Sequence, residues 1–174
     1  VASLDPPKTE PPGGYKTPRP VAYYRFVVIC IDRGTGQVRW QRVAREVVPQ
    51  EGRHPTNTYA SASPTTNGRR LYVSFGSHGI FCYDLDGQPI WDRDLGDMVT
   101  RFGWGEGTSP VLHGNRLIVN WDHEGQSFLV VLDSATGETM WRVDRQEVTS
   151  WSTPRVVEYA GRTQVIVPAT RRIT

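Results

Sequence analysis

Three segments of this chain have nearly the same sequence, and their spacing limits the possible folds more than any other feature. Residues 30–40, 82–91 and 131–141 each run from an apolar stretch through an Asp and a Gly to a closing Trp. The three tryptophans lie 51 and 50 residues apart. A fixed period of this length is typical of stacked supersecondary units, such as propeller blades or solenoid turns. The repeat therefore indicates an array of similar units.

A second motif alternates with the first and shows that each repeat is larger than a hairpin. Ser-Pro or Thr-Pro pairs close residues 62–64, 108–110 and 152–154, and each is followed by a Gly-containing turn and an apolar run. Short turns between such runs favour hairpins. The predicted strands are A, which carries the Ser/Thr-Pro pair, B, which is the apolar run, C, which ends at the Asp, and D, which ends at the Trp.

We therefore predict an all-β chain, a β-propeller of four-stranded antiparallel blades that supplies about three blades of a larger ring. The repeats span 27–60, 61–106 and 107–150, and 151–174 begins the next one. The Pro-rich residues 1–26 are predicted to form a loop or linker. Because rings need about four to eight blades, the chain is expected to be a piece of a longer one, with the next Asp hairpin about four residues beyond Thr174.

The recurring Asp, Gly and Trp have a structural explanation. Asp accepts backbone N–H bonds in a turn, and Gly takes the position with positive φ. A Trp on the outermost strand can cover the edge between neighbouring blades while its indole N–H bonds a backbone carbonyl. The predicted docking residues are Asp32, Gly36, Trp40, Asp84, Gly87, Trp91, Asp133, Gly137 and Trp141.

These segments resemble the quinoprotein-like (PQQ-like) propellers, whose tryptophan-docking motif is A-x-D-x-x-x-G-x-x-x-W. The first and third copies match at Asp, Gly and Trp with full spacing, whereas the second is one residue short. The small residue of the motif is Cys30, Cys82 or Val131 here, each expected to be buried. A kelch or WD40-type propeller is the alternative.

Composition excludes some classes of function. The net charge is +2 with both signs interspersed, so no stripe of basic residues indicates nucleic-acid binding. No apolar run is long enough for a transmembrane helix. The two cysteines occupy equivalent positions in successive repeats, and we expect them to be too far apart for a disulfide.

The long connections are the predicted binding surface. In a four-stranded blade the A–B and C–D turns share one face, and the B–C loops and D–A connections share the other, which we call the long-loop face. Rigid scaffolds usually bind through such loops. The candidate residues precede strands A and are His54, Asn57, Tyr59, Arg101, Trp104, Glu106 and Trp151. Alternatively, Trp104 and Trp151 pack between blades, and Arg101 pairs with Glu106 or Asp97.

Other motifs do not indicate a catalytic or metal site. The Gly-rich residues 103–107 lack the strand-to-helix context of a phosphate loop. Residues 122–124 are Asp-His-Glu, but adjacent residues of an extended segment point apart, so we expect no metal there. No catalytic residue is assigned.

The family resemblance implies two functions. Some members are dehydrogenases that hold PQQ and calcium, with a catalytic aspartate and in many cases a ring of adjacent cysteines, a pair that this chain lacks. Others, such as the outer-membrane assembly lipoprotein, are scaffolds without a cofactor. We expect a non-enzymatic scaffold, periplasmic or otherwise extracytoplasmic as the resemblance implies, that binds a protein or small-molecule ligand without a cofactor. The alternative is a PQQ-dependent alcohol or sugar dehydrogenase.

Overall fold

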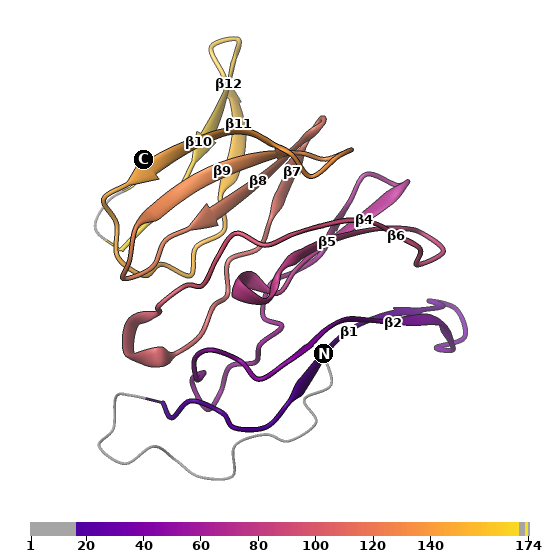
Figure 1. Cartoon of the computed structure of the whole chain (residues 1–174). Coiled ribbons are helices and arrows are strands. Elements are labelled where there is room, and N and C mark those ends of the chain that lie inside the picture. Colours follow the sequence, from indigo (N-terminus) through magenta and orange to yellow (C-terminus); the bar gives the residue numbers. More distant parts are fainter. Residues whose placement is uncertain (1–16, 171–172, 174) are drawn as a thin grey trace.

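The computed structural model describes residues 17–170 and residue 173, and its strands form a row of antiparallel sheets (Figure 1). Part of the predicted N-terminal loop, including Pro6, Pro7, Pro11 and Pro12, lies outside these residues. The elements are β1 (Tyr24–Ile31), β2 (Val38–Val47), β3 (Thr65–Thr66), β4 (Arg70–Ser74), the 3-10 turn η1 (Gly76–His78), β5 (Ile80–Asp84), β6 (Pro89–Arg93), η2 (Arg101–Gly103), β7 (Val111–His113), β8 (Arg116–Trp121), β9 (Ser127–Asp133), β10 (Thr139–Arg145), β11 (Arg155–Tyr159) and β12 (Arg162–Ile166).

Two of the sheets are complete four-stranded blades. Their orders are β3-β4-β5-β6 and β7-β8-β9-β10, with every neighbouring pair antiparallel. The hairpin β1-β2 supplies strands C and D of the blade before them, and β11-β12 supplies strands A and B of the blade after them. The predicted all-β fold of four-stranded antiparallel blades is confirmed, and the described residues supply about three of them.

The Asp turn between strands C and D forms for the reason that the sequence suggests. Asp32 Oδ1 accepts the N–H groups of Gly34 at 3.0 Å and Thr35 at 2.9 Å, and Gly36 has a φ of 72°. The bond from the Thr35 N–H is the main cause that holds the pKa of Asp32 below its ordinary value. The turn that begins at Asp133 repeats this arrangement.

The strand boundaries differ from the prediction in three respects. Strands D do not end at the tryptophans, since β2 continues to Val47 and β10 to Arg145. Antiparallel pairing explains this, because each Trp lies opposite the middle or end of strand C and the rest of C still needs a partner. The first strand begins at Tyr24, three residues before Val27, and the Ser/Thr-Pro pairs precede strands A rather than lie within them.

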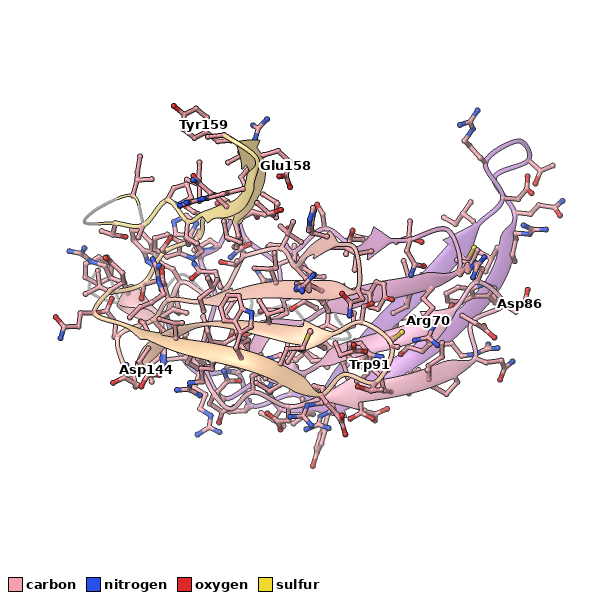
Figure 2. The ribbon with its side chains drawn as sticks, turned by 90° about the horizontal axis from the view of Figure 1, so that it is seen from above. Arg70, Asp86, Trp91, Asp144, Glu158 and Tyr159 are labelled. Atoms are coloured by element: carbon pink, nitrogen blue, oxygen red, sulfur yellow. The ribbon has the colours of Figure 1, made fainter. Side chains whose placement is uncertain are left out.

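Trp40 and Trp91 each contact the following blade through a hydrogen bond and ring packing. The Trp40 indole N–H donates to the Leu85 carbonyl at 2.9 Å, and the ring lies over Gly87, where a Cβ would come within 2.6 Å of it. The Trp91 N–H donates to the Ser134 carbonyl at 3.2 Å and lies over Gly137 in the same way. Figure 2 shows Trp91 near Arg70, whose side chain donates to the carbonyl of Ala135 in that same turn.

The apolar core lies between the blades rather than within one layer. One cluster joins Tyr72 and Cys82 of the second blade to Leu117 and Val130 of the third, and a second cluster joins β1 to β4 and β5. Cys82 and Val131 are fully buried, as expected for the small position of the motif. Cys30 is only half-buried, which corrects the prediction, because no strand covers the free edge of β1 in the described part of the chain. Cys30 and Cys82 are both free thiols.

Candidate functional site on the long-loop face

The three D–A connections, residues 48–64, 94–110 and 146–154, lie side by side at one end of the blades (Figure 1). The His54 N–H donates to the Trp104 carbonyl at 2.9 Å, which ties the first connection to the second. The Asn57 side-chain amide donates to the same carbonyl at 3.2 Å. The Trp151 indole N–H donates to the Gly105 carbonyl at 2.7 Å, which ties the third connection to the second. The connections therefore form one continuous surface.

Five side chains gather on this surface, and we call them the loop-face cluster: His54, Arg101, Phe102, Trp104 and Trp151. The Trp104 ring lies 5.2 Å from His54, 5.0 Å from Phe102 and 6.1 Å from Trp151, measured between centroids. The Arg101 guanidinium lies 5.1 Å above the Phe102 ring. Trp151 is 39% exposed and Arg101 is exposed, whereas the other three are half-buried.

Phe102 was not a candidate from the sequence, yet it lies at the centre of the second connection. Its φ of 59° is in the left-handed region, which is strained for a side chain of this size. Strained residues of this kind gather at functional sites, where the surrounding structure holds them. The sequence signal at Phe102 is limited to the segment Arg-Phe-Gly-Trp-Gly, and such a segment does not predict a particular backbone conformation.

Tyr59 does not join the loop-face cluster. Its ring packs in the core between the first two blades, 5.2 Å from Tyr24, and its hydroxyl donates to the Glu51 carbonyl at 2.8 Å. Burial raises its pKa above the ordinary tyrosine value. Tyr59 thus anchors the start of the first connection, at Glu51, to the core between the blades.

Glu106 also points inward. Its carboxylate accepts hydrogen bonds from the Ser77 N–H at 2.8 Å and from the Ser77 hydroxyl, which fastens the second connection to η1. A Cβ at Gly76 would collide with this carboxylate, so the turn requires Gly there. Burial raises the pKa of Glu106 to about 7. Arg101 makes no ion pair with Glu106 or Asp97 in the described part of the chain.

Two further acidic groups at this end, Glu51 and Glu124, hold neighbouring segments together. Glu51 accepts bonds from the N–H and hydroxyl of Thr100, at 2.9 and 2.8 Å. Glu124 accepts the Thr149 hydroxyl at 2.8 Å, and Thr149 in turn accepts the Arg101 N–H at 2.8 Å. These bonds set the position of Arg101 and of the cluster beside it.

Residues 122–124 are engaged in protein contacts. Asp122 is buried and pairs with Arg145 at 2.8 Å, and His123 accepts the Val99 N–H at 3.1 Å. Within residues 17–170, no three His, Cys, Asp or Glu side chains come together as a metal-ligand set. His78 is buried against Phe26, and burial lowers its pKa to about 4, so it stays neutral at pH 7.

The family of the chain follows from a comparison of its sequence with family models. The PQQ_2 model, described as outer membrane protein assembly factor BamB, matches residues 25–173. The chain belongs to this family. A comparison with curated proteins gives no match.

Several solved structures are similar to this PQQ_2 segment. BamB from Moraxella catarrhalis aligns with a TM-score of 0.50 and 18% identity, over 82% of this chain and 37% of that one. A europium-containing methanol dehydrogenase gives a TM-score of 0.49 and 13% identity over 72% and 23% of the two chains. The quinohemoprotein alcohol dehydrogenase from Comamonas testosteroni gives 0.48 and 16% over 70% and 19%. The PQQ_2 segment thus spans well under half of each of these proteins.

Two further observations concern membranes and cofactors. No helix among the described residues is long and apolar enough to cross a membrane. Glu51 and Glu106 line a cavity of about 30 Å³ between the blades, room for about one water molecule. Both carboxylates accept hydrogen bonds from protein groups, Glu51 from Thr100 and Glu106 from Ser77.

Proposed function

We propose that this PQQ_2 segment is a non-enzymatic scaffold that binds a protein partner through the loop-face cluster, outside the cytoplasm. The observation that carries the proposal is the exposed Trp151 and Arg101 beside Trp104 on a surface that hydrogen bonds hold in place. Tryptophan and arginine on a preformed surface dominate the energy of many protein interfaces. The family description, an outer-membrane assembly factor, supports a protein partner and an extracytoplasmic location.

The chemistry of the cluster favours a polypeptide over a small molecule. Small ligands bind in concave sites of several hundred Å³. The two larger hollows, of about 640 and 430 Å³, lie beside β1 and Trp40 and include no residue of the loop-face cluster. A surface of rings with a guanidinium at its edge suits an aromatic or acidic side chain presented by a partner.

The binding experiment compares two faces of the same protein. The tagged chain is incubated with a detergent extract of bacterial envelopes, and captured proteins are identified and purified for titration. We expect Arg101→Ala and Trp104→Ala to weaken the dissociation constant about tenfold or more. Arg69→Ala, in the exposed turn of the opposite face, should leave it unchanged. Equal losses for all three variants would contradict a specific site.

A stability measurement separates binding from packing. Arg101→Ala and Trp104→Ala should each lower the free energy of unfolding by no more than about 1 kcal/mol, because neither side chain is fully buried. A loss of about 3 kcal/mol or more would show that the cluster holds neighbouring connections together and would remove it as a site.

The enzymatic alternative has a direct test. The protein is reconstituted with PQQ and calcium, and dye-linked alcohol oxidation is measured. We expect no turnover above that of free PQQ. Clear turnover that a chelator abolishes would overturn the scaffold proposal.

A further inference from the structure

Residues 17–20, with the sequence Thr-Pro-Arg-Pro, lie against the long-loop face, and we call them the strap. Figure 1 shows the strap, in indigo, beside the connection that contains η2. The Thr17 N–H donates to the Phe102 carbonyl at 3.1 Å, and the Thr17 hydroxyl donates to the Gly103 carbonyl. One residue of the strap thus binds two consecutive carbonyl groups of the second connection.

Two glycines leave the space that the strap occupies. Gly52 of the first connection and Gly103 of the second are both buried, and they lie 51 residues apart, which is the spacing of the first two docking tryptophans. A Cβ on Gly103 would come within 2.8 Å of the Thr17 hydroxyl oxygen, and a Cβ on Gly52 would collide with the same oxygen. Glycine permits so close an approach because it has no side chain. Equivalent positions of two successive repeats therefore form one slot for the strap.

The prolines of the strap favour this contact. A proline has a fixed φ, and the residue before it is restricted to extended conformations. Thr17 and Arg19 are each followed by a proline. A segment that is already restricted in this way loses less conformational entropy when it is ordered against a neighbour. The sequence of the strap therefore lowers the entropy cost of holding Thr17 in the slot.

The carbonyl groups that Thr17 binds belong to the strained part of the second connection. Phe102 and Gly103 have φ values of 59° and 65°, so two consecutive residues are in the left-handed region. This conformation is unfavourable for Phe102 and persists only where the surrounding structure holds it. Within the connection, the Gly103 N–H donates to the Thr100 carbonyl at 3.0 Å. The two bonds from Thr17 hold the same turn from outside.

We propose that Thr17 is a positioning residue, which holds Phe102 in its left-handed conformation and so keeps Trp104 in place in the loop-face cluster. The Trp104 ring follows the turn directly and lies 5.0 Å from the Phe102 ring. Release of the strap would let Phe102 return to an ordinary backbone conformation, and both rings would move. The consequence for partner binding rests on the proposed function, whereas the consequence for the turn does not.

Amide hydrogen exchange tests the hold on the turn without any partner. The readout is the exchange of the Gly103 and Gly105 amides, which both donate within the second connection. Thr17→Val removes the hydroxyl and keeps the shape, so this exchange should become about fivefold faster, as expected for the loss of one hydrogen bond. Thr17→Ser should restore the original rate. Thr66→Val, which removes a hydroxyl that donates to a backbone carbonyl at 2.6 Å on the opposite face, should leave it unchanged.

Two results of this measurement would overturn the proposal. One is an unchanged exchange rate of the Gly103 amide in Thr17→Val. The other is an equal acceleration in β8 and β9, because Thr17 would then act on the stability of the whole fold rather than on the turn.

A second pair of variants displaces the strap without changing its sequence. Gly52 and Gly34 both have φ values outside the left-handed region, so alanine adds no strain of that kind at either position. The new methyl group would collide with Thr17 at position 52, whereas the nearest atom at position 34 is 3.5 Å away. Gly52→Ala should therefore speed the exchange of the Gly103 amide, and Gly34→Ala should not. Equal rates in the two variants would contradict the slot.

Titration with the captured partner tests the consequence for binding. Thr17→Val should raise the dissociation constant about fivefold, and Thr17→Ser should stay close to the unmodified protein. If Thr17→Val speeds exchange but Trp104→Ala does not weaken binding, the proposed function is wrong while the hold on Phe102 is supported. If Trp104→Ala weakens binding and Thr17→Val changes neither exchange nor binding, the proposed function stands and the role of Thr17 is wrong.

Discussion

At the scale of single residues, glycine conformation and tryptophan packing act together. Gly87 and Gly137 have φ values of 78° and 75°, and each also lies directly under an indole ring. Repetition of the motif predicts that glycine is needed for its positive φ, because the Asp turn places a residue in that conformation. Glycine is also needed because a side chain would collide with the tryptophan of the neighbouring blade, about 45 residues away in the sequence. Only the regular spacing of the tryptophans suggested this contact.

The two requirements can be measured separately. Gly137→Ala should destabilise the fold by about 2 to 3 kcal/mol, because the methyl group adds a clash with Trp91 to the backbone strain. Gly114→Ala meets no atom within 4 Å and adds strain alone, about 1 kcal/mol. Urea unfolding of the two variants gives the difference. Equal losses would show that Trp91 moves aside without cost.

The buried carboxylate of Glu106 should make stability depend on pH. Its folded pKa of about 7 lies above its ordinary value, so the folded state binds the proton more tightly. This contribution is present at low pH and is lost as the pH rises through about 7. Glu106→Gln should therefore flatten the fall in melting temperature between about pH 5 and 7. The exposed Glu138→Gln control should keep the slope of the unmodified protein.

At the scale of strands, the repeat predicted element order and pairing better than element ends. The D strands extend past their tryptophans because their length is set by the partner strand C, which no local motif encodes. The membership of the candidate site was predicted only in part, again because long-range contacts decide it. His54, Arg101, Trp104 and Trp151 do meet, whereas Tyr59 and Glu106 turn inward, because loop side chains follow long-range contacts such as those with Glu51 and Ser77.

The two cysteine thiols should differ in reactivity, because Cys30 lies on an edge strand and Cys82 on an interior strand. Burial raises the pKa of the Cys82 thiol to about 11, so it should react with a thiol reagent only after unfolding. Cys30, half-buried on β1, should react faster in dilute solution. Non-reducing peptide maps of the folded protein should show no bridge between the two. Such a bridge would contradict the blade spacing.

At the scale of the whole molecule, burial is greatest in the middle of the row. Strands β8 and β9 are almost entirely buried, whereas β11 and β12 are mostly exposed. Sequence hydropathy alone did not predict this difference, since β1 is as apolar as β9 and is only partly covered. The neighbours of a blade, rather than its own composition, decide how well it is buried.

Amide hydrogen exchange should reveal this gradient. Protection is expected to be greatest in β8 and β9 and lowest in β11 and β12, because local opening costs least where few apolar contacts are lost. The order can be checked by mass spectrometry of peptic fragments from dilute protein. Uniform protection along the chain would indicate a single cooperative unit that includes the half-blades.

The contact made by Trp40 on the turn at Leu85, and repeated by Trp91 at Ser134, always points from one blade to the next in chain order. A blade thus has a turn that accepts the tryptophan of the preceding blade, and a tryptophan on its outer strand that contacts the turn of the following blade. A segment of one period, duplicated in frame, would encode a blade that carries both the tryptophan and the turn of this contact. Growth of the array by internal duplication therefore needs no compensating substitutions at this contact.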